Sequence, residues 1–182
     1  MASNTASATP PVLGLHHAAY RCRDAEETRH FYEDILGLPL VHVVTADHVS
    51  IGKSTPFAHV FFELADGSCI AFFDLGDNVA AEPSPNTPAW VNHIAFKVPS
   101  MEALNAMKTR LQSHGIEVLG ITDHEFVNSI YFFDPNGVRL EFTTQVVGDD
   151  AMEGYARDAH GALKTWNERK AQRTREAANA HA

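Results

Sequence analysis

Two histidines and one glutamate occupy positions from which they could hold a metal ion together. His17 stands in LHHAAYRC, His93 in VNHIAFKV, and Glu141 in the strand-like run VRLEF. Two neutral imidazoles and one carboxylate on one side of a divalent ion form the facial triad favoured by Fe(II) oxygenases, in which the remaining positions stay open. Open positions allow chemistry at the metal. Manganese, zinc, nickel or cobalt could also sit in such ligation.

An internal repeat relates the segments that carry these residues. LHHAAYRCRDAEETRHFYEDILGLPL and VNHIAFKVPSMEALNAMKTRLQSHGIEV each predict a short strand followed by a helix. Asp24 and Ser100 are the expected helix N-caps, and Gly37 and Gly115 the expected ends. Three strand-like runs follow each glycine, at 38–47, 57–64 and 68–75 and again at 116–123, 128–134 and 138–144. Each half therefore reads strand, helix, strand, strand, strand.

The repeat predicts an α+β fold in which two βαβββ modules form a curved mixed sheet around a metal cleft. The modules cover residues 13–82 and 89–147, and the proline-rich segment 83–88 (PSPNTP) is the linker. Residues 148–182 predict a C-terminal helix and tail. We expect the helix to fray after about residue 170. It packs on the sheet or on another subunit through residues at helical spacing: Met152, Tyr155, Ala159, Leu163 and Trp166. Residues 1–12 read as a disordered tail.

Composition excludes several partners. A formal net charge of −9 and a pI near 5.6 indicate no surface for nucleic acid or an anionic membrane. No apolar run approaches the ~18 residues that a membrane span needs, and the N-terminus lacks the pattern of a signal peptide. The two cysteines, Cys22 and Cys69, fall in predicted strands without zinc-site spacing. We therefore expect a cytoplasmic protein with a small organic partner.

Superposing the two halves places His17 on His93 and Glu141 on Ala71. Because strand side chains alternate between faces, the four equivalent inward positions carry histidine, alanine, histidine and glutamate. A lone strand histidine is more often a hydrogen-bonded core residue than a ligand. Two histidines at one repeat position, with a carboxylate at a third, favour a metal site.

The segment HEFVNSIYFFDPNGVRLEF (124–142) predicts a hairpin closed by the DPNG turn. Together with HHAAYRCRDAEETRHFY and NHIAFKV, it resembles the vicinal oxygen chelate superfamily, which includes glyoxalase I, fosfomycin resistance enzymes, bleomycin-binding proteins and type I extradiol dioxygenases. The resemblance covers Leu13 to Val147. The order TDH, IYFFDPNG and VRLE is similar to the extradiol dioxygenase signature.

The resemblance implies that His17, His93 and Glu141 hold iron, that Tyr131 bonds a substrate hydroxyl and that His124 lines the pocket. The repeat maps Ser129 onto His59, so His59 is also a candidate for the inward face. Larger members carry an acid/base histidine on the strand that here reads SCIAFF, where Ser68 and Cys69 stand. Either proton transfer falls to His59, His124 or Tyr131, or the reaction is a different one. Each also has a structural interpretation, as a strand-end histidine, a solvated histidine or a half-buried strand aromatic.

These features predict a metal-dependent dioxygenase, with Fe(II) as cofactor, that cleaves a catecholic ring with O₂. One alternative is a glyoxalase- or epimerase-like lyase or isomerase, although its usual fourth carboxylate is replaced by Ala71. The other is a metal-free small-molecule-binding resistance protein. The expected partners are a small aromatic diol and O₂. The resemblance further implies a homodimer or higher homo-oligomer, with the site built from one chain or from two.

Overall fold

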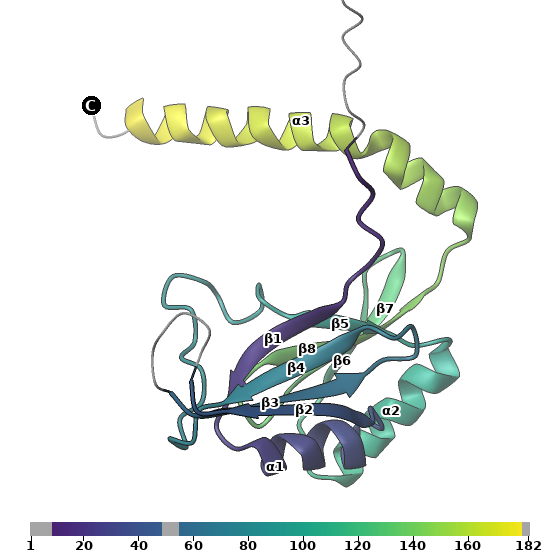
Figure 1. Cartoon of the computed structure of the whole chain (residues 1–182). Helices are drawn as coiled ribbons and strands as arrows, with labels where there is room; N and C mark the ends of the chain where they lie inside the picture. Colours follow the sequence, from purple (N-terminus) through teal and green to yellow (C-terminus); the bar gives the residue numbers. More distant parts are fainter. Residues whose placement is uncertain (1–8, 49–54, 180–182) are drawn as a thin grey trace, which may run out of the picture.

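The computed structural model describes residues 9–48 and 55–179 (Figure 1). The first module consists of β1 (His17–Cys22), α1 (Ala25–Arg29) continuing into the π-helical segment η1 (His30–Ile35), β2 (Leu40–Ala46), β3 (Phe57–Glu63) and β4 (Cys69–Asp74). The second consists of β5 (Ile94–Lys97), α2 (Met101–Ser113), β6 (Leu119–Asp123), β7 (Val127–Phe133) and β8 (Arg139–Gln145), and α3 (Asp149–Asn179) follows. The predicted α+β class, with two βαβββ modules and a C-terminal helix, is confirmed. The tail expected at residues 1–12 lies mostly outside the described residues.

Each module forms its own four-stranded mixed sheet, in the orders β1-β4-β3-β2 and β5-β8-β7-β6. The outer pairs β1–β4 and β5–β8 are parallel, whereas the other pairs are antiparallel. Ala19 lies opposite Ala71 in the first sheet, and Ala95 lies opposite Glu141 in the second. The register therefore confirms that Glu141 and Ala71 occupy equivalent positions.

The helix boundaries follow local chemistry. Asp24 accepts a hydrogen bond from the Glu27 amide at 2.7 Å, so it caps α1. Ser100 caps α2 in the same way, through the Ala103 amide at 3.2 Å. Gly37 adopts a φ of 80° after η1, a left-handed conformation in which glycine has no Cβ to clash.

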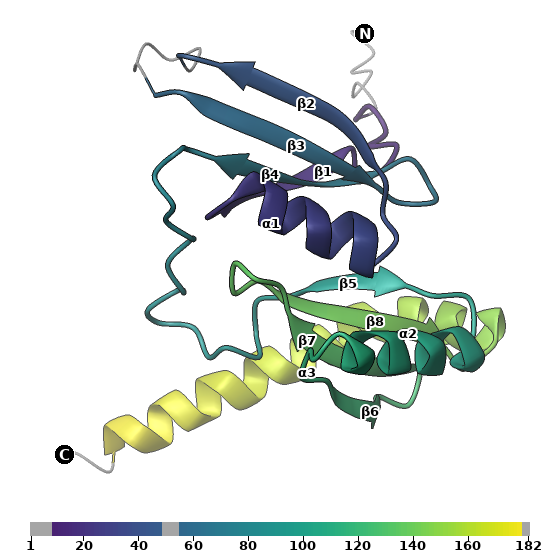
Figure 2. The same cartoon turned by 90° about the horizontal axis from the view of Figure 1, so that it is seen from below.

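The first helix lies between the two sheets (Figure 2). Tyr32 packs on the first sheet, with ring centroids 4.8 Å from Phe72 and 5.3 Å from Phe62. Its neighbour Phe31 contacts the second sheet through Phe132, at 6.4 Å. Consecutive helical side chains point about 100° apart, so one helix can pack against two sheets. The faces of the sheets that turn away from this helix consequently lie on opposite sides of the chain.

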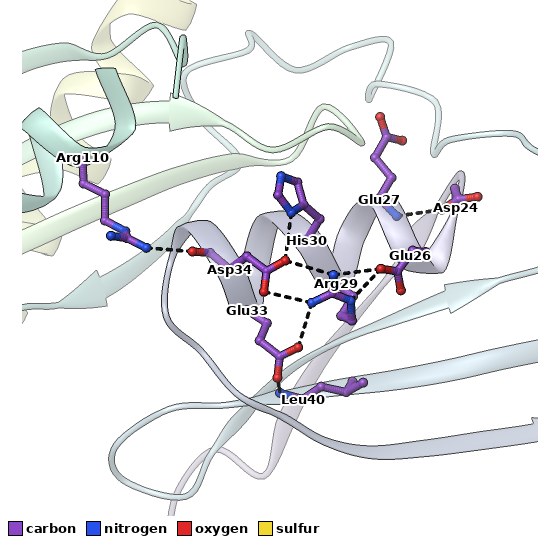
Figure 3. Close-up of polar contacts among 9 residues, drawn as sticks. All are labelled: Asp24, Glu26, Glu27, Arg29, His30, Glu33, Asp34, Leu40 and Arg110. Carbon is purple, nitrogen blue, oxygen red and sulfur yellow. Dashed lines mark hydrogen bonds and ion pairs between the residues drawn. The ribbon is translucent and has the colours of Figure 1, made fainter. Parts of the chain in front are cut away.

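Charged side chains cover the outer surface of this helix (Figure 3). Arg29 forms ion pairs with Glu26, Glu33 and Asp34. The Arg29 guanidinium lowers the pKa of Asp34 to about 2, so the pair stays charged across the physiological range. Arg110 of α2 donates to the backbone carbonyls of Asp34 and Ile35. These contacts hold α2 against the first module.

The DPNG turn also joins the modules. Asn136 accepts a hydrogen bond from the Arg23 amide at 2.9 Å and donates one to the Thr28 hydroxyl at 3.1 Å. Tyr32 donates to Asp134 at 3.1 Å. Burial raises the pKa of Asp134, although backbone amides of the turn also donate to it. The turn that the sequence explains as a hairpin is therefore also an intermodule contact.

We predict that Asn136→Ala destabilises the fold by about 2–4 kcal/mol, because the Arg23 amide and the buried Thr28 hydroxyl of α1 both lose their hydrogen bonds to Asn136. The free energy of unfolding in urea measures this effect. Asn105→Ala is the matched control, since the exposed Asn105 amide bonds only to a carbonyl within α2. The control should stay within about 0.5 kcal/mol of the parent. Equal stabilities of the two variants would show that the turn does not join the modules.

Helix α3 extends to Asn179, beyond the expected fraying near residue 170. It projects away from the sheets (Figure 1), and none of its described residues is buried. Tyr155, Leu163 and Trp166 are about half exposed. Among the described residues, the Tyr155 ring contacts Phe126, with ring centroids 6.0 Å apart, and no such ring contact to the sheets is seen for Trp166. The expected packing on the chain's own sheet is therefore limited to the start of the helix. Among the described helices, none is long and apolar enough to cross a bilayer.

Candidate metal centre

His93 and Glu141 meet on the face of the second sheet that turns away from α1. The Nε2 atom of His93 lies 3.0 Å from Glu141 Oε2. Glu141 is buried, with 5% of its surface exposed, although it stands on a strand whose neighbours Leu140 and Phe142 fill the core. A buried carboxylate needs a cationic or hydrogen-bonding partner to offset the cost of desolvation.

The orientation of the His93 ring defines which nitrogen faces the carboxylate. His93 Nδ1 lies 2.9 Å from the Val91 carbonyl oxygen, which can only accept, so Nδ1 carries a proton. In a neutral ring, Nε2 then presents its lone pair to Glu141. Two acceptors 3.0 Å apart repel each other unless a proton or a metal ion lies between them. This arrangement fits a divalent metal and supplies two ligands for it.

Tyr131 and His124 adjoin the same pair. Tyr131 lies opposite Glu141 in the β7–β8 register, and its hydroxyl is 2.7 Å from His124 Nε2. Burial, followed by the nearby Glu141 carboxylate, raises the pKa of the Tyr131 phenol. The phenol therefore stays protonated at neutral pH and can donate a hydrogen bond. The structure thus brings together four of the six residues that the sequence singled out.

His17 and His59 form a separate group on the first sheet. Their ring centroids are 6.0 Å apart, and both rings lie near Phe61, at 5.4 Å and 4.1 Å. His17 also has its Nδ1 atom 2.7 Å from His16 Nδ1. The register places these side chains on the face that carries Ala71. This face turns away from α1, as the Glu141 face does.

His59 is buried, and its Nε2 atom has no hydrogen-bond partner among the described residues. Burial, and then the neighbouring His17 and His42, lowers the pKa of His59. The ring therefore favours its neutral form, which can accept a proton. An orphaned buried nitrogen is costly in a finished fold, so a ligand or a second chain is expected to meet it.

Within one chain, the predicted triad does not assemble. No group of three histidine, cysteine, aspartate or glutamate side chains in the described part of the chain is placed to hold a metal ion. His93 and Glu141 lie on one outer face and His17 on the other, because α1 and η1 fill the space between the sheets. Of the two arrangements that the sequence left open, a site built from one chain or from two, the described residues do not form the first.

The strand position at which larger relatives carry an acid/base histidine is structural here. Ser68 donates to Asp66 at 2.6 Å and so closes a turn. Burial raises the pKa of the Cys69 thiol, so this cysteine favours the neutral thiol form. Neither residue offers proton transfer. Sequence reasoning overlooked Arg139, whose guanidinium carbon lies 4.3 Å from the centre of the Tyr131 ring. The sequence could have indicated Arg139, because it stands two residues before Glu141 and residues at this spacing share a strand face.

The chain is 28% identical over 148 residues to "Putative ring-cleaving dioxygenase MhqA" of Bacillus subtilis (strain 168), and the match covers 79% of this chain. It covers only 43% of that relative, so the chain spans less than half of the relative's length.

Two solved structures show the same fold. One is a glyoxylase/bleomycin resistance protein/dioxygenase domain from Frankia sp. EAN1pec, with a TM-score of 0.58, 20% identity, and coverage of 74% of this chain and 99% of that one. The other is the fosfomycin resistance protein FosX from Listeria monocytogenes, solved with Mn(II) and sulfate, with a TM-score of 0.55, 20% identity, and coverage of 75% and 96%. The family model described as Glyoxalase/Bleomycin resistance protein/Dioxygenase superfamily matches residues 14–142. The chain belongs to this superfamily.

Proposed function

We propose that this protein is a metal-dependent extradiol-type dioxygenase whose site is shared by two chains. His93 and Glu141 of one chain would bind the metal together with His17 of a second copy. The observation that carries the proposal is the His93–Glu141 pair, with Nε2 3.0 Å from Oε2, and the Tyr131–His124 pair beside it. The ring-cleaving description of the Bacillus subtilis relative supports the reaction type.

A second copy is proposed because each outer face carries half of a site. On the face with His17 and His59, the buried His59 Nε2 atom has no hydrogen-bond partner in the described part of the chain, and the face with His93 and Glu141 carries a pair that can bind a metal ion. The exposed apolar side chains of α3, Tyr155, Leu163 and Trp166, offer surface for the same association. Closing the two faces on each other would also exclude water from the centre.

Two histidines and one carboxylate fit Fe(II) best, although Mn(II), Zn(II), Ni(II) or Co(II) could occupy such a site. When bound, the metal would hold an aromatic diol and O₂ as neighbours, which removes most of the entropic cost of their encounter. Tyr131 would donate a hydrogen bond to an oxygen of the bound diol, because its phenol stays protonated. His59, neutral and buried, or His124 would accept the second phenolic proton.

The alternatives receive less support. A glyoxalase- or epimerase-like enzyme usually uses a fourth inward carboxylate, and the buried Ala71 occupies that position. A metal-free binding protein would need a proton, in place of a metal ion, between His93 Nε2 and Glu141 Oε2, which lie 3.0 Å apart. Proton abstraction from a carbonyl substrate remains the second candidate function.

Anaerobic reconstitution with Fe(II), followed by a panel of catechols under air, tests the proposal. We expect a yellow ring-fission product and consumption of one O₂ per diol, whereas protein reconstituted with Zn(II) should give neither. Elemental analysis of protein purified without chelators should find metal at about one ion per chain. Protein that holds iron but cleaves no catechol would refute the reaction, and protein that retains no metal would favour the binding role.

A further inference from the structure

Arg139 is the only arginine of the two modules, within the described residues, whose guanidinium donates to no oxygen. The other four donate to carboxylates or backbone carbonyls: Arg21, Arg23, Arg29 and Arg110. Arg139 instead lies over the Tyr131 ring, with its Cζ 4.3 Å from the ring centroid. Its five N–H donors are consequently left for a ligand or for water.

The strand register positions this guanidinium beside the candidate metal centre. Arg139 and Glu141 are two residues apart on β8 and share a face, and Tyr131 lies opposite Glu141 on β7. Stacking on Tyr131 is a cation–π contact that restricts the rotamers of the long arginine side chain. The charge is therefore held on this face.

A cavity of about 320 Å³ has both Arg139 and His93 in its wall. Tyr20 and Phe133 also line it, so an aromatic ring could contact apolar surface there. Glu82 lies in the same wall and forms no ion pair with Arg139 among the described residues. The volume suits a ligand with a single aromatic ring.

We infer that Arg139 binds an acidic group of the ligand, so that the substrate class is an aromatic vicinal diol bearing a carboxylate. The diol part of this inference rests on the proposed function. The Arg139 Cζ is 4.3 Å from the Tyr131 ring centroid, which is 6.0 Å from the His93 ring, so Arg139 and His93 are no more than about 10 Å apart. One substituted benzene ring can span this distance. The planar guanidinium matches a carboxylate with two parallel hydrogen bonds.

Steady-state kinetics on iron-reconstituted protein tests this specificity with paired substrates. Catechol and methylcatechol are the neutral probes, and protocatechuate and homoprotocatechuate are the acidic ones. We expect Arg139→Gln to lower kcat/KM for the acidic probes by about 10- to 100-fold, mainly through KM, because a charge-assisted pair is lost. The neutral probes should change less than about threefold. Arg139→Lys should recover only part of the loss, since lysine keeps the charge but lacks the planar guanidinium that donates two parallel hydrogen bonds.

Lys97→Gln is the matched control, because it removes the same unit charge from the same face of neighbouring β5, which is parallel to β8. This control should leave the preference for acidic probes unchanged. A similar loss in both variants would mean that net charge, and not Arg139, sets the preference, and the inference would be wrong. An equal effect of Arg139→Gln on acidic and neutral probes would also overturn it.

A binding measurement separates this inference from the proposed reaction. Calorimetric titration with benzoate and its neutral analogue benzamide involves no diol and no turnover. We expect benzoate to bind the parent protein more tightly than benzamide, and Arg139→Gln to abolish that difference. If no catechol is cleaved but the benzoate preference depends on Arg139, the dioxygenase proposal fails while acid recognition stands. If catechols are cleaved without any such preference, only the present inference fails.

Discussion

Glu141→Gln is expected to abolish metal binding and to lower catechol turnover at least about a thousand-fold, which corresponds to roughly 4 kcal/mol of lost transition-state stabilisation. Glutamine keeps the size of the side chain but removes its charge. Its amide would also donate to His93 Nε2, which lies 3.0 Å from Glu141 Oε2 in the parent, and would occupy the lone pair that a metal requires. Both effects act in the same direction.

Elemental analysis after reconstitution and O₂ consumption with an active catechol measure the two losses. Glu117→Gln serves as the control, because Glu117 is an exposed glutamate between α2 and β6, outside the strands that carry the proposed ligands. The control should keep its iron and turnover within about twofold, as expected for a surface change. A Glu141→Gln protein with full iron content and normal turnover would remove the ligand role of Glu141.

Mixing two inactive variants is expected to restore activity if the site is shared between chains. His17→Ala and Glu141→Gln each destroy both sites of a homodimer. In a heterodimer, one site carries both changes, while the other combines the intact His17 of one chain with the intact His93 and Glu141 of its partner. Because a twofold dimer has two equivalent sites, a purified heterodimer should show about half of the parent activity.

Two affinity tags, one on each variant, allow the heterodimer to be isolated after co-expression. His93→Ala paired with Glu141→Gln is the control, since both residues come from the same chain in each site and every site stays defective. This pair should remain inactive. Recovery in neither pair would place the three ligands in one chain, in a conformation different from the one described here. Recovery in both pairs would mean that at least one of the single changes is not deleterious.

Local patterns sufficed to predict much of the fold. The N-caps Asp24 and Ser100 were predictable because a cap depends on one side chain and an amide three residues on. The equivalence of Glu141 and Ala71 was predictable because strand side chains alternate and the repeat conserves the strand order. The hairpin of β7 and β8 was predictable from the DPNG turn, and its register places Tyr131 opposite Glu141 in the structure.

Long-range packing could not be predicted in this way. The bonds from Asn136 to Arg23 and Thr28 join residues more than a hundred positions apart, and nothing in the turn sequence distinguishes such a role from ordinary turn chemistry. The exposure of most of α3 could not be predicted either, because an apolar stripe on a helix does not specify which surface will pack against it.

Sequence alone was enough to identify which side chains share one face of each sheet, because the alternation of strand side chains and the internal repeat can both be read from the sequence. These are His17 and His59 on the first sheet, and His93, Tyr131 and Glu141 on the second. The spatial relation of those two faces was decided by packing. Phe31 and Tyr32 direct two adjacent aromatic rings toward different sheets, so the helix fills the space between the modules. The two ligand-bearing faces consequently point outward, and a complete metal centre requires a second chain in our proposal.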